Sequence, residues 1–561
     1  YIPGNSLSDI LIFKARVLNA NNEVVSEQFR SSLTLDEDKQ SGSYLKCAIE
    51  GLKTNMFIEY FYLGKAYLNF RGTEYVQSQQ QKLRLDYEII SPVNLGFEAK
   101  MYNYDAAFKK TADTTKNVMA CSMVNISERS TESYSASDAN LVRVEYKFAY
   151  NYAEDKARKY TWESAGLRFY NILHENLEPS KSIKKLIKEN GVASLSMPDK
   201  IYFIEQFVKT SIAIDDRAPY ETAEDILKNK IGAKTNIIRL FIAYFRELNI
   251  KYEIYMVSNR LQAPLDKSFD SWNFLESYLL YFPEIDKYID PSNYGVRLGQ
   301  VIYTAAETNA LNIKEIKIGE TAKGLSVIKI IPSSVYEKNK DILVSDISFT
   351  KELDAVKIVN GRKITGYMAD NVRPFYYYAN SEKREEYIKN YIRQEDNNIT
   401  VLSVQVNNFD LATNLDDKPF ELNYEINNKN ILERAGDKML LKVGDVIGRQ
   451  AELYQEKKRI SDIDMNYPHQ YLRTIHVTVP KGYKVSNLSA ATLNFQYTDD
   501  KGKDLMAFVS SAVQNNDVVT ISIDEHYALT KLSKTRFDDF KNVINAAADF
   551  NKVVLVFEPI K

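Results

Sequence analysis

The sequence has few of the residues on which thiol, imidazole and metal chemistry depend. Its 561 residues include two cysteines and four histidines. Two thiols allow at most one disulfide, between Cys47 and Cys121, so no disulfide framework is expected, and the sequence leaves open whether they are bonded. The histidines show no close metal-ligand spacing: they are His174, His469, His476 and His526. We therefore expect no zinc site and no cofactor.

An excess of charge of one sign is also lacking. Lysine and arginine number 73, aspartate and glutamate 75, and the formal net charge is −2. This balance gives no general attraction to nucleic acid or to an anionic membrane. No apolar run is long enough for a transmembrane segment. Because the chain starts at Tyr1, we expect a mature protein that has lost a targeting segment, which is compatible with secretion but does not demonstrate it.

A chain of this length exceeds what one hydrophobic core supports, so several domains are expected. Apolar residues alternate with polar ones from Leu83 to Ile89 and from Val142 to Tyr150. Such alternation is typical of strands with one face on a core and the other in water. Residues 1–158 are therefore predicted to form an N-terminal antiparallel β-sandwich.

Helical spacing replaces this alternation after Trp162. Ser196, followed by a proline and an aspartate, predicts the start of one helix, and Thr222 predicts the start of a second. A third helix should begin near Ala233 or Lys234. Its apolar residues cover nearly the whole circumference, so we expect it to be buried centrally.

Strands are expected after this helix, at 252–257, 272–282 and 287–290. A buried helix followed by antiparallel strands predicts an α+β core over residues 159–311. Residues 312–414 are predicted to form a β-rich connecting region with one helix, capped by Ser381. A C-terminal β-sandwich is predicted over residues 415–561. The predicted fold class is thus multidomain α+β.

This order of elements resembles the bacterial transglutaminase-like proteins of the papain-fold superfamily, in which domains of unknown function flank the core. The resemblance covers most of the chain. Stretches similar to the family's final domain are Tyr467–Tyr471, Ile475–Tyr483 and Phe537–Pro559. The beginning of the chain is similar to a point already inside the family's N-terminal sandwich, which implies that upstream strands are missing.

Members of that family carry a cysteine at the N-terminus of the buried helix, usually within Gly-Asp-Cys-Lys. A thiolate there is stabilised by the helix dipole and unpaired backbone N–H groups, while a histidine and an aspartate complete a triad. The matching stretch here is Ile231-Gly232-Ala233-Lys234. The histidine position falls within 269–273, most closely at Ser271, and the aspartate is kept as Asp290. The resemblance implies a degenerate triad, Ala233, Ser271 and Asp290, without nucleophile or base.

Other candidate sites are weaker. Cys121 with His174 could form a separate nucleophile–base pair, but buried cysteines usually behave as small hydrophobes. Asp462 and Asp464 lack the glycine and the distal glutamate of a calcium loop, so a solvated turn is the simpler interpretation. Asp290 precedes a proline and could serve only to cap a turn.

The leading hypothesis is a non-catalytic pseudoenzyme, not an enzyme, acting as a protein-binding scaffold or accessory factor. The resemblance implies the cell envelope of a Gram-negative bacterium, in the periplasm or at the outer membrane or cell surface. A scaffold predicts a broad apolar patch with a polar rim. One alternative is a glycan- or peptidoglycan-binding module, which predicts an exposed row of aromatic residues. The other is a hydrolase with a site outside the degenerate cleft, which needs a deep pocket with convergent carboxylates.

Overall fold

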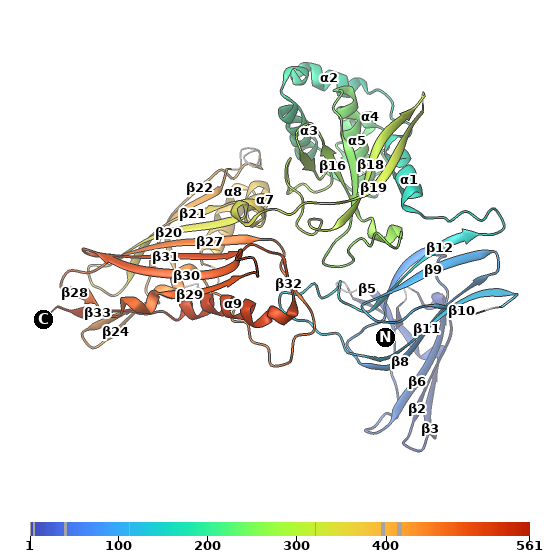
Figure 1. Cartoon of the computed structure of the whole chain (residues 1–561), viewed down its shortest axis with the longest axis horizontal. Helices are drawn as coiled ribbons and strands as arrows, with labels where there is room; N and C mark the ends of the chain where they lie inside the picture. Colours follow the sequence, from blue (N-terminus) through green and yellow to red (C-terminus); the bar gives the residue numbers. More distant parts are fainter. Residues whose placement is uncertain are drawn as a thin grey trace. The chain divides into compact units, whose positions relative to one another are not determined.

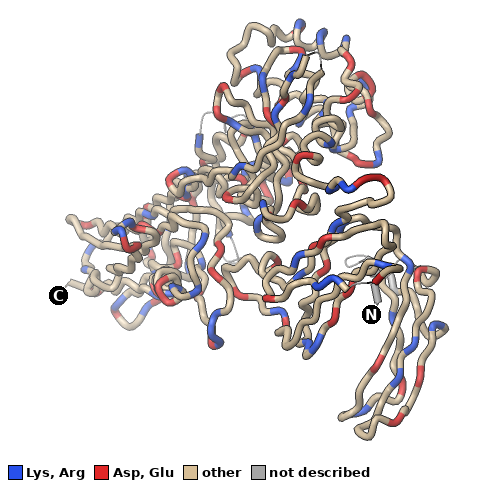
Figure 2. Tube along the Cα trace, turned by 45° about the vertical axis from the view of Figure 1, so that its right-hand side comes forward, with Lys and Arg blue, Asp and Glu red and all other residues tan. Residues whose placement is uncertain are grey.

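The computed structural model describes residues 2–3, 6–38, 42–111, 113–319, 321–393, 399–411 and 418–560 (Figure 1). The chain divides into two compact units, Tyr1–Gly72 and Thr73–Lys561. The architecture is mixed α+β and rich in sheets, as the sequence predicts. Lysine and arginine are interspersed with aspartate and glutamate along the trace in Figure 2, in keeping with the near-zero net charge.

The N-terminal unit contains two small sheets. One has the strand order β1-β5-β4 (Ile2–Pro3, Gly42–Cys47, Leu33–Asp38), and the other has the order β3-β2-β6 (Val24–Phe29, Ile10–Leu18, Phe57–Gly64). Its core is formed by Ile10, Phe13, Ala15, Leu33 and Leu45. The unit boundary at Gly72 divides the range 1–158 that the sequence predicts as one sandwich.

The rest of that range forms two further sheets with a core of their own. Their strand orders are β10-β11-β8 (Lys109–Thr111, Lys116–Ile126, Lys82–Pro92) and β7-β12-β9 (Arg71–Tyr75, Arg143–Asn151, Leu95–Tyr102). The core contains Met101, Cys121, Met123, Val142 and Val144. Local alternation predicts the strands correctly, but it cannot separate one sandwich from two because the separation depends on which sheets pair.

The polar face of β12 is buried, although the alternation predicts that it meets water. The exposed fractions of Arg143, Glu145 and Lys147 are 2%, 0% and 0%. Lys147 forms an ion pair with Asp270, and Glu145 accepts a hydrogen bond of 3.0 Å from Asn273. These contacts satisfy charges that would otherwise be costly to bury. The polar face therefore packs against another part of the chain instead of water.

The helices of the core follow. They are α1 (Trp162–His174), α2 (Lys181–Glu189), α3 (Met197–Ser211), α4 (Ala223–Asn229) and α5 (Lys234–Glu247). The predicted caps are confirmed: the Ser196 side chain accepts from the N–H of Asp199, and the Thr222 side chain from that of Asp225. Helix α5 is central, as its apolar circumference predicts. Its buried residues are Ile237, Ile238, Leu240, Phe241, Ile242, Tyr244 and Phe245.

The described strands of the core form a five-stranded antiparallel sheet. Its order is β17 (Lys287–Ile289), β16 (Ser277–Phe282), β15 (Glu253–Val257), β18 (Asn309–Ile318) and β19 (Thr321–Ile330). The core thus continues to Ile330, past the predicted end at residue 311, because β18 pairs with β15. Helix α1 packs closely on β19, where a Cβ on Gly324 would lie 2.7 Å from the carbonyl oxygen of Gly166. Only glycine permits this approach.

Residues predicted as a connecting region and a separate C-terminal sandwich share one eight-stranded sheet. Its order is β22 (Thr400–Asn407), β23 (Phe420–Asn428), β21 (Val356–Ile364), β20 (Lys340–Phe349), β27 (His469–Thr478), β31 (Val518–Tyr527), β30 (Asp504–Asn515) and β29 (Leu493–Thr498). Strands β20 and β27 pair in parallel although they are far apart in sequence. This pairing merges the two predicted regions.

Smaller elements complete this part. A four-stranded sheet has the order β24 (Leu432–Ala435), β25 (Lys438–Leu441), β33 (Leu555–Pro559) and β28 (Tyr483–Val485). The helices are α6 (Gly366–Asp370), α7 (Arg373–Tyr378), α8 (Ser381–Arg393) and α9 (Phe537–Asn551). Asn380, not Ser381, caps α8, since the N–H of Lys383 donates to Asn380 Oδ1 at 2.9 Å. No helix among the described residues is long and apolar enough to cross a membrane.

The two aspartates considered for calcium have other roles. Asp464 forms an ion pair with Arg260, whose side chain is 1% exposed. The Arg260 guanidinium also donates to the carbonyl oxygen of Met465 at 2.7 Å. Asp462 accepts from the backbone N–H of Lys534 at 2.9 Å. The predicted solvated turn is therefore wrong for Asp464, which belongs to a buried ion pair.

Candidate functional site: a cleft at the start of helix α5

Ala233 occupies the N-cap position of α5. Its backbone is extended, with φ −67° and ψ 150°, and its side chain makes no cap hydrogen bond. An N-cap residue normally supplies an oxygen for the first free N–H groups of a helix. Asp216 takes this role instead, because its Oδ1 accepts from the N–H of Lys234 at 2.9 Å.

A pocket of about 350 Å³ opens beside this helix start. Residues from α5, from the adjoining ends of β15 and β16, and from the turn after β17 line it. Those with chemistry of interest are Lys234, Asn259, Glu276, Ser277, Asp290 and Ser292. The start of α5 and Asp290, which the family resemblance assigns to one degenerate triad, therefore line one cleft.

Asp290 is held rigidly in this cleft. It is 5% exposed, and its Oδ1 accepts from the backbone N–H of Ser292 at 3.0 Å, from Ser292 Oγ at 2.9 Å and from the N–H of Asn293 at 3.1 Å. These bonds form the Asp-Pro turn that the sequence suggests. One carboxylate oxygen is thus committed to the turn.

Glu276 supplies the second carboxylate. It directly precedes β16, and its backbone N–H donates to the carbonyl oxygen of Val257 at 3.0 Å. Partial burial raises the pKa of Glu276, while a hydrogen bond from the backbone of Asn259 and the positive charge of Lys234 act in the opposite direction. Sequence reasoning missed this residue. It could have been found from its position within the predicted strand 272–282, because that strand pairs with the one predicted to end at Asp290.

Ser271 does not lie among the residues that line the cleft. It is fully buried, and its Oγ accepts from the N–H of Asn273 at 3.3 Å, so it caps a short 3-10 turn, Trp272–Phe274. The strand expected over 272–282 begins only at Ser277. The structure therefore brings the helix start and Asp290 together, and places Glu276 instead of Ser271 beside them.

The cleft offers a cation, carboxylates and hydroxyl groups, which together can bind a polar chain. Two hydroxyls already have partners: Ser292 Oγ donates to Asp290, and Ser258 Oγ accepts from the N–H of Leu265 at 2.9 Å. Within the part of the chain that the structure describes, no group of three or more His, Cys, Asp or Glu residues is placed to hold a metal ion.

Cys121 and His174 do not form a pair. Cys121 is buried in the core between the sheets of residues 73–151, and burial raises the pKa of its thiol. His174 lies in α1, with Nδ1 2.7 Å from the carbonyl oxygen of Tyr170 and Nε2 2.8 Å from the hydroxyl of Tyr252. Burial lowers the pKa of His174 to about 4. Cys47 and Cys121 are both free thiols.

Comparison with known proteins informs the fold. No family model and no curated protein matches the chain. A solved structure from Parabacteroides distasonis ATCC 8503, described as a "putative protease", aligns with a TM-score of 0.54 and 11% sequence identity. The alignment covers 98% of this chain and 89% of that one. The two proteins share a fold. At this identity the likeness concerns the fold alone.

Proposed function

We propose that this chain is a transglutaminase-like pseudoenzyme that binds a segment of another protein in the cleft at the start of α5 without cleaving it. The observation that carries the proposal is the composition of that cleft. Lys234, Glu276 and Asp290 line it, and Ala233 stands at the helix start where the resembling family has its cysteine. An alanine methyl group cannot attack a carbonyl carbon.

The chemistry of the cleft favours recognition of a basic side chain. Glu276 and Asp290 present carboxylates, and Lys234 can bind a backbone carbonyl of the same segment. A lysine or arginine of the partner would pair with the carboxylates, and such charge-assisted hydrogen bonds are strong and directional. The family that the sequence resembles implies that this role is carried out at the envelope of a Gram-negative bacterium.

The first experiment tests the ancestry of the cleft by restoring a nucleophile and a base. In the double variant Ala233→Cys/Glu276→His, the introduced thiol should have a pKa below the ordinary value of about 8.5, because the helix N-terminus and an imidazolium both stabilise the thiolate. The rate of iodoacetamide alkylation, followed peptide by peptide with mass spectrometry from pH 5 to 9, measures it. The native Cys47 and Cys121 are then internal references.

Ala233→Cys alone is the matched control, since it keeps the same helix N-terminus but leaves the carboxylate of Glu276 beside the thiol. We expect a higher thiol pKa in the single variant than in the double variant. Equal alkylation profiles in the two would contradict the view that Glu276 stands where the family has its base.

The second experiment tests binding without cleavage. Fluorescence polarisation would compare a labelled lysine-rich peptide with an acidic peptide of equal length, and mass spectrometry would check that each is recovered intact. Glu276→Gln should lower the affinity for the basic peptide by about tenfold, which is the effect expected from the loss of one charge-assisted hydrogen bond. Glu247→Gln, at the other end of α5, should leave the affinity unchanged. Cleavage that persists in Asp290→Asn would instead favour a hydrolase with its site elsewhere.

A further inference from the structure

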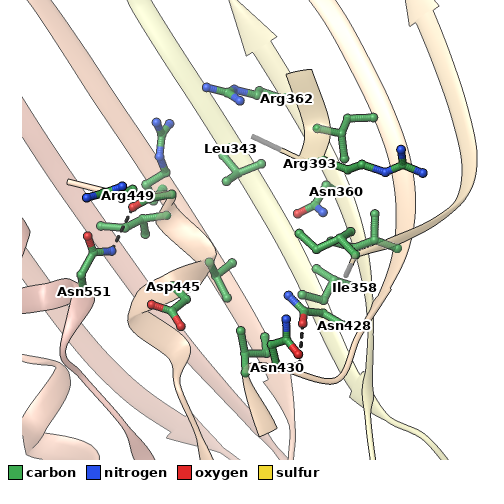
Figure 3. A pocket seen from close by; sticks show the side chains of 18 of the residues that line it. Leu343, Ile358, Asn360, Arg362, Arg393, Asn428, Asn430, Asp445, Arg449 and Asn551 are labelled. Atoms are coloured by element: carbon green, nitrogen blue, oxygen red, sulfur yellow. Dashed lines mark hydrogen bonds between the residues drawn. The ribbon is translucent and has the colours of Figure 1, made fainter. Parts of the chain in front are cut away.

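A pocket of about 800 Å³ lies on a face of the eight-stranded sheet (Figure 3). Two polar side chains of its floor are bonded within the chain. Asn360 Oδ1 accepts from Ser345 Oγ at 2.6 Å, and Arg362 Nε donates to Asp341 at 2.9 Å. These contacts account for the polar groups of the floor without a ligand. The rim of the cleft at the start of α5, in contrast, is held by contacts from outside the core.

This rim belongs to the loop that follows Asp290. Ser292, Asn293 and Tyr294 are among the residues that line the cleft, whereas residues 295–300 are not. Asp290 fixes the first half of the loop through its bonds to Ser292 and Asn293. Because these bonds end at Asn293, the position of Tyr294 must be set by other residues.

Arg297 is the centre of the contacts that hold Tyr294. Its side chain is fully buried, and its Nη1 donates to the carbonyl oxygens of Tyr294 at 2.6 Å and Val296 at 3.0 Å. Its Nε donates to Gln206 Oε1 of α3 at 3.4 Å. A buried guanidinium is costly unless its N–H groups are satisfied. The loop must therefore keep a shape that supplies these acceptors.

Helix α7 supplies a contact that bridges Tyr294 and Arg297. The hydroxyl of Tyr378 donates to the carbonyl oxygen of Tyr294 at 3.0 Å and accepts from Arg297 Nη2 at 3.3 Å. The hydroxyl of the neighbouring Tyr377 accepts from Gln206 Nε2 at 3.3 Å. Two donors, Arg297 Nη1 and the Tyr378 hydroxyl, thus meet on one carbonyl oxygen and use both of its lone pairs.

Helix α6 joins the same network from a second side. The backbone N–H of Arg297 donates to Gln300 Oε1 at 3.0 Å, and Gln300 Nε2 donates to Asp370 Oδ1 at 2.9 Å. Both ends of the segment from Tyr294 to Gln300 are therefore tied to α6 and α7. These two helices lie beyond Ile330, where the core ends.

We infer that Tyr378 is a positioning residue for the cleft, and that the docking of α6 and α7 holds the rim in the shape that binds the partner segment. The inference rests on the proposed function, because it concerns the affinity of the same cleft. A rim that is already ordered loses less conformational entropy on binding than a mobile one. The C-terminal part therefore contributes to recognition, although every residue that lines the cleft lies in the core.

Hydrogen exchange of the full chain without peptide tests the order of the rim. Tyr378→Phe removes the hydroxyl and keeps the ring. Tyr387→Phe is the matched control, since its hydroxyl donates to the carbonyl oxygen of Asn371 at 3.5 Å, a contact within the C-terminal part. Followed by mass spectrometry, segment 291–297 should exchange about two- to tenfold faster in Tyr378→Phe, the ratio that corresponds to one hydrogen bond. It should exchange at the wild-type rate in Tyr387→Phe.

Fluorescence polarisation with the labelled lysine-rich peptide measures the consequence for binding. Tyr378→Phe should lower the affinity by about two- to tenfold at a melting temperature close to that of the wild type, and Tyr387→Phe should leave the affinity unchanged. The inference is overturned by wild-type exchange rates in Tyr378→Phe, by faster exchange with unchanged affinity, or by an equal loss of affinity in both variants. If the wild type binds neither the lysine-rich nor the acidic peptide, the proposed function fails, whereas the exchange rates still decide whether Tyr378 orders the rim.

Discussion

Replacing Glu205 by glutamine should strongly destabilise the core. Glu205 and Lys209 lie one turn apart on α3, and both side chains are fully buried. Lys209 Nζ donates to Glu205 Oε1 at 2.7 Å and to the carbonyl oxygen of Val296 at 2.9 Å, while Glu205 Oε2 accepts from the N–H of Leu298 at 2.8 Å. The pair thus anchors α3 to the loop that follows Asp290 in the cleft.

The size of the destabilisation follows from the buried, unpaired lysine that the substitution leaves. Breaking a buried ion pair by removing one partner costs about 3–5 kcal/mol. Burial already lowers the pKa of Lys209. In the variant, the unpaired lysine can therefore avoid a buried charge by losing its proton. From an unfolded pKa of 10.5, deprotonation at pH 7 costs at most about 1.36 × 3.5, or roughly 5 kcal/mol. The two figures agree, and we expect the free energy of unfolding to fall by about 3–5 kcal/mol at pH 7.

This origin predicts a characteristic pH dependence. In the Glu205→Gln variant the folded chain holds a neutral Lys209, whereas the unfolded chain holds a protonated one. The unfolded state therefore binds more protons, and stability must rise with pH. The loss relative to wild type should shrink by about 1.4 kcal/mol per pH unit above pH 7, for as long as Lys209 of the wild type stays protonated.

Urea unfolding followed by tryptophan fluorescence suits the measurement, because the chain's two tryptophans, Trp162 and Trp272, both lie in the core. Glu189→Gln is the matched control, since its pair with Lys185 is exposed and 3.9 Å long. It should change stability by less than about 1 kcal/mol. The reasoning is refuted if the two variants lose equal stability, or if the loss in Glu205→Gln is independent of pH.

Two further predictions concern the C-terminal part of the chain, which contains the eight-stranded sheet. Burial raises the pKa of Glu525 from an unfolded value of 4.5 to about 7. The stability of the folded chain is therefore highest below pH 4.5, and about 3 kcal/mol is lost as pH rises from there to about 7. In Glu525→Gln the melting temperature should depend less on pH between pH 5 and 8 than it does in the wild type. A pH dependence equal to that of the wild type would contradict this. In Gly444→Ala the new Cβ would lie 2.1 Å from the carbonyl oxygen of Phe550, so calorimetry should show a loss of about 1–3 kcal/mol. Gly361→Ala, whose nearest atom is 3.5 Å away, should be neutral or slightly stabilising, and equal effects would refute the steric argument.

Helix starts were predictable because their signals span only a few residues. Ser196 and Thr222 cap their helices as expected, since a cap oxygen reaches an N–H group within the next turn. The shift from Ser381 to Asn380 has the same origin. Both residue types cap helices well, and adjacent candidates differ too little for sequence to choose between them.

Domain boundaries were not predictable in the same way. The core extends to Ile330 because β18 pairs with β15, and the C-terminal regions merge because β20 pairs with β27. A strand pattern states which residues alternate, but it does not name the partner strand. Partners are selected by the packing of whole faces, and these faces come together only in the folded chain.

For the candidate site, the sequence alone determined which residues are available. No cysteine follows Cys121, no histidine lies between His174 and His469, and a helix with apolar residues around nearly its whole circumference begins near Ala233 or Lys234. The tertiary structure alone decided that Glu276, not Ser271, shares a cleft with Lys234 and Asp290. It also decided that charged residues of β12 are buried. Composition and helical period are local properties, whereas the burial of a polar group depends on partners supplied by distant segments of the chain.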